Sequence, residues 1–176
     1  IPVSNMNYVI RPVSIHGCTI KVASLGAVAT LKEYRGKGYA TTLLNDCIAR
    51  MRHQGVHILL ISGDRRLYRN VGSMPAGVTY GFSIDENTSL KSDSRSLERY
   101  SIREINMEKC EEGDFIKFAR LYRSENVRFI RKYDEFKQLL LSRKHLPRIT
   151  SMKKVIALDD KNEFAAYMYL AVNGKN

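Results

Sequence analysis

The chain has 176 residues, of which 44% are hydrophobic and 27% charged, with 11 glycines and four prolines. This composition excludes a disordered, collagen-like or low-complexity chain, and the length allows one sizeable core or two small ones. The longest apolar runs are far shorter than the ~20 residues of a transmembrane helix, and no basic segment followed by an apolar one begins the chain. We therefore expect no membrane span and no signal peptide. Because the first residue is Ile1, the chain is expected to be a fragment of a longer protein.

The basic residues are spread along the whole chain. Lys and Arg number 29 against 18 Asp and Glu, which gives a net charge of +11. Residues 1–100 hold 13 basic and seven acidic residues, and residues 101–176 hold 16 and 11. Since no tail or block concentrates the charge, a nucleic-acid partner is disfavoured, and a small polyanion such as a nucleotide cofactor is favoured.

The cysteines give no metal or disulfide pattern. Cys18, Cys47 and Cys110 are odd in number and widely spaced, without a CxxC pair or a Cys/His cluster. We therefore expect no metal site and a reduced, cytoplasmic location.

The first segment begins with a predicted β-hairpin. Residues 7–15 and 19–31 are rich in Val, Ile, Thr and Ala without a helical period, and the turn His16-Gly17 joins them. A helix is predicted over residues 39–53, ended by Gly55. Its apolar residues recur at three- and four-residue steps and form one stripe: Ala40, Leu43, Leu44, Cys47, Ile48 and Met51.

Three further elements are predicted in this segment. Residues 56–62 form a continuous apolar run, which is typical of a strand buried on both faces of a parallel or mixed sheet. A short helix over residues 65–71, closed by Gly72, and a strand over residues 78–84 follow.

A polar stretch, residues 85–99, is the predicted linker between two domains, residues 1–84 and 100–176. The second domain is expected to contain a strand, two helices and a β-hairpin, in that order: residues 100–105, 111–124, 134–143, 154–158 and 163–172. Its aromatic residues are predicted to lie in a core rather than on a base-stacking platform: Phe115, Phe118, Tyr122, Phe129 and Phe136.

Residues 30–40 run from a predicted strand through a loop containing Gly36 and Gly38 into a predicted helix. Glycines let successive backbone N–H groups converge on one point. The free amides in the first turn of a helix and the helix dipole favour an anion at that point. Arg35 and Lys37 add positive charge. A P-loop is excluded because GxxxxGK[ST] is missing, and the dinucleotide fingerprint is excluded because Thr41 stands at its third glycine. The alternative is a surface turn with capping glycines.

This loop resembles the pyrophosphate loop of the GNAT superfamily of acyl-CoA transferases. The family pattern is Arg or Gln, two residues, Gly, one residue, then Gly or Ala, and Arg35, Gly38 and Ala40 match it. The pair Leu67-Tyr68 with Gly72 after it is similar to another family segment, although Ser73 replaces the usual aromatic residue. Within the family, residues 61–68 are most similar to the enhanced-intracellular-survival type, in which one chain holds two GNAT-like halves.

The resemblance implies an α/β fold with a GNAT-type mixed sheet flanked by helices, followed by a partial second GNAT-like α+β segment. It covers residues 15–84 well and residues 100–176 in outline. The strand and two helices that open the family's fold are not seen upstream of Asn7, but residues 100–176 have their order. They are either a second half cut short, which we favour, or a piece that completes the first half.

The resemblance also implies acetyl-CoA as the donor and names residues that would hold it. The backbone of Val28, Ala29 and Thr30 would face the pantetheine arm and the thioester. The tail of residues 56–64, with Gly63 and Asp64, would diverge from the preceding strand and open a slot for the cofactor. The pyrophosphate would be held by the loop: Arg35, Gly36, Lys37, Gly38, Tyr39, Ala40 and Thr41.

The chemistry of amide formation assigns roles to few side chains. An alkylammonium with a pKa near ~10.4 must lose a proton before it attacks, and the oxyanion needs a donor, which a backbone N–H of residues 28–30 would supply. Tyr68 is the predicted acid for the departing thiolate; the alternative is a core aromatic residue. Asp64 is a candidate base, or else a helix N-cap, and the four histidines are expected to be structural: His16, His53, His57 and His145.

The predicted function is therefore an N-acetyltransferase that joins acetyl-CoA and a primary amine in a ternary complex, without a metal. Two alternatives are a non-catalytic CoA-binding or scaffold module and a basic nucleic-acid-binding protein. The identity of the amine and the oligomeric state, a homo-oligomer included, stay open.

Overall fold

The computed structural model describes residues 1–78, 80–81, 99–142 and 151–172. The chain divides into two compact units. Unit 1 comprises Ile1–Phe82 and Val127–Ile130, and unit 2 comprises Ser83–Asn126 and Arg131–Asn176. Residues 85–98, most of the predicted linker, lie outside the described residues.

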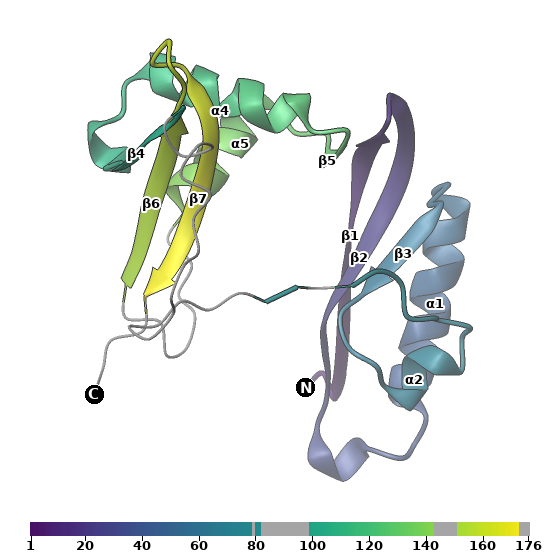
Figure 1. Ribbon diagram of the computed structural model, residues 1–176. Helices are drawn as coiled ribbons and strands as arrows, with labels where there is room; N and C mark the ends of the chain where they lie inside the picture. The colour runs from purple at the N-terminus through teal and green to yellow at the C-terminus, as the bar shows by residue number, and fades with distance from the viewer. Residues whose placement is uncertain (79, 82–98, 143–150, 173–176) are drawn as a thin grey trace. The chain divides into compact units, whose positions relative to one another are not determined.

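Unit 1 contains a mixed sheet with the strand order β3-β2-β1-β5 (Figure 1). β1 (Ser4–Ile15) and β2 (Cys18–Thr30) form the predicted antiparallel hairpin. Its turn has positive φ at both His16 and Gly17, the conformation of a two-residue turn whose twist matches that of a hairpin. β3 (Ile58–Ile61) pairs with β2 in parallel, as predicted for a mixed sheet.

A strand that the sequence did not predict, β5 (Val127–Phe129), pairs antiparallel with the end of β1. It is only three residues long, which is too short to show an alternating pattern. It places Phe129 opposite Val13 in the sheet of unit 1.

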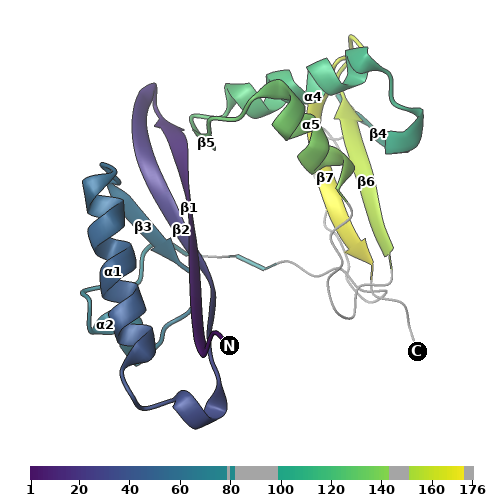
Figure 2. The same ribbon diagram turned by 180° about the vertical axis from the view of Figure 1, so that it is seen from behind.

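Two helices lie on the same side of this sheet (Figures 1 and 2). α1 (Tyr39–His53) has the predicted bounds, and Leu44, Cys47 and Met51 of its apolar stripe are buried. α2 (Arg66–Arg69) is the predicted short helix, and Tyr68 on it is buried against Leu44. A 3-10 turn, Lys32–Tyr34, connects β2 toward α1.

The expectation that residues 56–62 form a strand buried on both faces is wrong. Ile58 is 43% exposed and Leu60 47% exposed, while Leu59 and Ile61 pack on the side of α1 and α2. Within the described part of the chain β3 is an edge strand, and the helices there cover only one of its faces. Of the strand predicted over residues 78–84, the described residues 78, 80 and 81 are not in a strand, and the others lie outside the described residues.

Unit 2 contains an antiparallel sheet with the order β4-β6-β7 and two helices. All five elements match the sequence prediction within a few residues: β4 (Ser101–Glu104), α4 (Glu112–Ser124), α5 (Tyr133–Leu141), β6 (Ser151–Leu158) and β7 (Phe164–Val172). A 3-10 turn, Met107–Lys109, precedes α4. The predicted aromatic core is confirmed for Phe115, Phe118 and Phe136, which are buried between the helices and the sheet.

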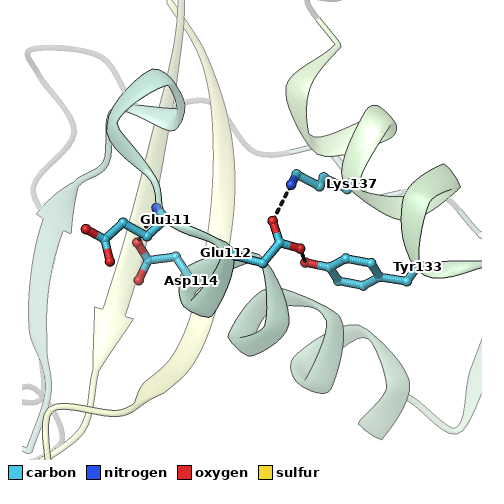
Figure 3. Close-up of polar contacts among 5 residues, drawn as sticks. All are labelled: Glu111, Glu112, Asp114, Tyr133 and Lys137. Carbon is cyan, nitrogen blue, oxygen red and sulfur yellow. Dashed lines mark hydrogen bonds and ion pairs between the residues drawn. The ribbon is translucent and has the colours of Figure 1, made fainter.

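A polar cluster joins α4 to α5 (Figure 3). Glu112 on α4 accepts hydrogen bonds from the Tyr133 hydroxyl and the Lys137 ammonium group. The bond from Lys137, and next the bond from Tyr133, lower the pKa of Glu112. The bond to the Glu112 carboxylate, with smaller contributions from burial and nearby acids, raises the pKa of Tyr133 to about 12.

These two shifts predict how the stability of unit 2 depends on pH. Because the pKa of Glu112 is lowered from 4.5 on folding, its stabilising effect is present above pH 4.5 and lost below it. Because the pKa of Tyr133 is raised from 10 to about 12, its effect is present below pH 10 and lost as the pH rises through about 12. The difference in urea midpoint between the wild type and Glu112→Gln should therefore be constant between these limits and shrink outside them. A difference that does not vary with pH would contradict this assignment.

Candidate functional site

The connection from β2 to α1 has a backbone that requires glycine at two positions. Gly36 has φ +75° and Gly38, the residue that caps the start of α1, has φ +84°. Both values are in the left-handed region that L side chains rarely adopt. Apart from its two chain neighbours, a Cβ at either glycine would meet no atom within 4 Å, so no more distant part of the described chain fills the space beside them.

The main-chain N–H groups of residues 36–41 are unpaired within the described part of the chain. The first hydrogen bond of α1 runs from the Thr42 N–H to the Gly38 C=O, at 3.0 Å, which leaves the N–H groups of Tyr39, Ala40 and Thr41 without a helical acceptor. No side chain of the described residues caps this end of the helix. The free amides and the dipole of a 15-residue helix together favour an anion here.

Two basic side chains flank these amides. Arg35 Nε donates to the carbonyl of Thr30, at 3.1 Å, which fixes the arginine against the end of β2. The Lys37 ammonium lies 5.0 Å from the centre of the Tyr34 ring, and Tyr39 is exposed beside that ring, with the two ring centres 6.3 Å apart. The loop therefore combines main-chain donors with positive charge.

β2 and β3 pair over only four residues each and then separate. The last pair is Leu25 with Ile61, after which Gly63 turns the chain with φ +107°. On the side away from β1, the edge of β2 over residues 26–30 thus has no strand partner among the described residues. This unpaired edge of β2 begins where the pairing with β3 ends, after Leu25, and continues to the loop that carries the free amides.

A β-bulge interrupts the hairpin at the same place. Asn7 pairs with Gly26 and Asn5 with Ala29, so Met6 stands opposite two residues, Ala27 and Val28. Ala27 has φ +50°, a conformation that is strained for alanine. Two side chains of β1 hold the bulged segment: Asn5 Nδ2 donates to the Ala27 carbonyl at 3.0 Å, and Ser4 Oγ to the Ala29 carbonyl at 3.2 Å.

Tyr68 and Asp64, the two side chains predicted to act on protons, lie in different surroundings. The Tyr68 ring is 4% exposed and packs with Leu25 and Leu44, with Val28 beside this cluster. Its hydroxyl has no hydrogen-bond partner among the described residues. Asp64 does not cap α2, in contrast to one expectation; its carboxylate instead pairs with Arg69 at 2.8 Å, and both side chains are exposed.

The histidines and cysteines form no second site in the described residues. His57 Nδ1 accepts the Lys21 N–H at 3.0 Å, a contact that joins the start of β3 to β2. The three cysteines are free. In the described ranges no group of three or more His, Cys, Asp and Glu side chains is arranged to hold a metal, and no helix there is both long and apolar enough to span a membrane.

Residues 2–75 match the family of the acetyltransferase (GNAT) domain. These residues hold all of the features just described: the free amides, the separating strands, the bulge and Tyr68. We call them the GNAT segment. No curated protein matches the chain.

The solved structures that are similar to nearly the whole chain include the following two. One is a conserved protein of unknown function from Enterococcus faecalis V583, described as a probable N-acyltransferase, with 17% identity and a TM-score of 0.63; the match covers 97% of this chain and 42% of that one. The other is the N-myristoyltransferase of Saccharomyces cerevisiae with bound myristoyl-CoA and inhibitors, with 13% identity and a TM-score of 0.54, covering 95% and 42%. The chain spans less than half the length of either. The predicted α/β class, with a GNAT-type mixed sheet flanked by helices, is confirmed.

Sequence reasoning did not find Ser4, Asn5 or Ala27. Their contacts depend on the strand register and on one extra residue in β2, and neither has a signal in composition or spacing. The only local sign is Gly26, since a glycine inside a strand pattern suggests a bulge nearby.

Proposed function

We propose that the protein transfers an acyl group, acetyl in the simplest case, from a coenzyme A thioester to a primary amine. The observation that carries this proposal is the row of unpaired amides of residues 36–41 beside open space at the start of α1. The match of residues 2–75 to the acetyltransferase (GNAT) domain supports the same function.

The donor would bind along two continuous features of the GNAT segment. Its diphosphate would accept hydrogen bonds from the loop amides, with Lys37 and Arg35 neutralising part of its charge. Its pantetheine arm, an extended chain with two amide groups, would lie against the unpaired edge of β2 near Val28 and Thr30. The thioester would then lie close to the bulge and to Tyr68.

The reaction would proceed by direct attack in a ternary complex. The neutral amine forms a C–N bond to the thioester carbon, and the oxyanion that develops accepts a hydrogen bond from a backbone N–H of the bulged segment. The C–S bond then breaks, and the thiolate takes a proton from the Tyr68 hydroxyl. The amine gives up its own proton to water or to Asp64, whose exposed carboxylate pairs with Arg69.

A binding measurement followed by product detection tests the proposal. Acetyl-CoA should raise the melting temperature of the protein, and mass spectrometry should find an acetylated product in a panel of aminoglycosides, polyamines, peptides and small amino metabolites. Longer acyl-CoA donors, in the same assay, define which acyl group is used. Stabilisation without any product would instead favour a non-catalytic CoA-binding module. Absence of stabilisation, with salt-sensitive binding to random duplex DNA, would contradict the proposal.

A further inference from the structure

We propose that Asn5 is a positioning residue that holds the bulge of β2 in the conformation in which the Val28 N–H is directed to the thioester oxygen. This inference rests on the proposed function. Asn5 lies on β1 and is remote in sequence from every residue of the loop and of α2, so it belongs to none of the motifs that indicate acyl transfer.

Ala27 is strained, because its φ is +50°. A positive φ at a residue with a Cβ is unfavourable, and such residues persist only where their surroundings hold them. The Asn5 side chain supplies such a contact, because its Nδ2 donates to the Ala27 carbonyl at 3.0 Å. Since this asparagine amide is the donor, an acceptor-only side chain of the same shape cannot replace it.

The peptide group between Ala27 and Val28 sets the direction of the Val28 N–H. The peptide bond between Ala27 and Val28 is trans, so the Ala27 C=O and the Val28 N–H point in opposite directions. A carbonyl directed at Asn5 therefore directs the Val28 N–H away from Asn5. Asn5 belongs to β1, and β1 pairs with one edge of β2. The Val28 N–H is thus directed toward the other edge of β2, which over residues 26–30 has no strand partner among the described residues. Val28 itself packs beside the cluster that contains Tyr68.

Ser4 holds the segment of β2 beyond the bulge. Ser4 Oγ contacts both the Ala29 carbonyl, at 3.2 Å, and Thr30 Oγ1, at 2.9 Å. These bonds fix β2 just beyond the bulge, so the segment is held on both sides of Val28. A donor fixed before the reaction stabilises an oxyanion without reorganisation.

The chain offers a matched set of variants. Asn5→Asp keeps the shape of the side chain but removes the donor, and Asn5→Ala removes the contact. Asn7→Ala is the control, because Asn7 is an exposed asparagine on the same strand and face that makes no side-chain hydrogen bond to the described residues. Ala27→Gly lets residue 27 adopt a positive φ without the hydrogen bond from Asn5, because glycine has no Cβ. This change is combined with Asn5→Ala to test whether it restores the activity that Asn5→Ala loses.

Turnover is one readout. Removal of an oxyanion donor costs ~10²–10³ in kcat, so its misplacement in Asn5→Ala and Asn5→Asp should cost roughly 10-fold or more. The KM for acetyl-CoA should hardly change, because the loop that holds the diphosphate is intact. Asn7→Ala should keep wild-type kcat, and Ala27→Gly should restore most of the activity of Asn5→Ala. Wild-type kcat in Asn5→Ala, an equal loss in Asn7→Ala, or failure of the rescue would overturn the inference.

A second readout does not depend on activity. In the free protein, the NMR carbon shifts of Ala27 and the amide signal of Val28 should change in Asn5→Ala and Asn5→Asp and return in the double variant. Unchanged signals would overturn the inference even if the enzyme is active. If the wild type neither binds acetyl-CoA nor acetylates any amine, the proposed function fails, and these signals still decide whether Asn5 directs the Val28 N–H.

Discussion

Gly38→Asp is expected to abolish acetyl-CoA binding. The substitution places a carboxylate at the residue that caps α1, between unpaired amides and beside open space. Two unit charges ~5 Å apart repel by about 3 kcal/mol at an effective dielectric constant of ~20, and the diphosphate carries more than one charge. This corresponds to a loss of affinity of at least ~10²-fold. Isothermal titration of the variant with acetyl-CoA measures the loss.

The matched control for this change is Gly38→Asn. Asn and Asp have the same shape, and both tolerate a positive φ better than most residues, so the two variants share the backbone strain at φ +84°. Asn carries no charge, and its amide can donate a hydrogen bond to a phosphate. We expect Gly38→Asn to retain most of the affinity. Equal affinity in the two variants would show that the anion does not bind at this end of the helix.

Tyr68→Phe is expected to lower kcat by ~10²-fold while the affinity for acetyl-CoA stays nearly unchanged. The Tyr68 ring is buried with Leu25 and Leu44, and Phe keeps these contacts. The change removes only the hydroxyl, which has no hydrogen-bond partner among the described residues, so little stability should be lost. Steady-state kinetics at saturating acetyl-CoA, with a direct binding measurement, separates the two effects.

Tyr8→Phe is the control for Tyr68→Phe. Tyr8 packs beside the same cluster, but its hydroxyl lies 3.5 Å from Gln54 Nε2 and accepts a weak hydrogen bond there. Removal of this hydroxyl should leave kcat unchanged within about twofold. If both variants lose activity equally, or if Tyr68→Phe turns over at the wild-type rate, Tyr68 does not protonate the thiolate.

The elements of the GNAT segment differ in how well they can be predicted from the sequence. α1 has the predicted bounds because its stripe and the flanking glycines, Gly38 and Gly55, are local signals. The burial of β3 was predicted wrongly because an apolar run does not show whether a second layer covers the strand. Ile58 and Leu60 are exposed on the face that the helices leave open.

The features of the candidate site also differ in how well the sequence predicts them. The loop of residues 35–41 has a local pattern of glycines and charges, so its role was a prediction from sequence. The hydrogen bond from Asn5 to the Ala27 carbonyl joins residues 22 positions apart. It exists only because the register of the hairpin shifts between Asn5 and Asn7. β5 was missed for a related reason, since three residues contain too little pattern to indicate a strand and its partner, β1, lies far away in the sequence.

We expect main-chain donors at the start of α1 to bind a diphosphate. NMR titration of the isotope-labelled protein with coenzyme A tests it most directly, because each amide reports separately. The largest shifts of amide signals should fall on residues 36–41, with smaller ones along residues 28–30, and they should disappear in Gly38→Asp. Coenzyme A that leaves the signals of residues 36–41 unchanged would contradict the account.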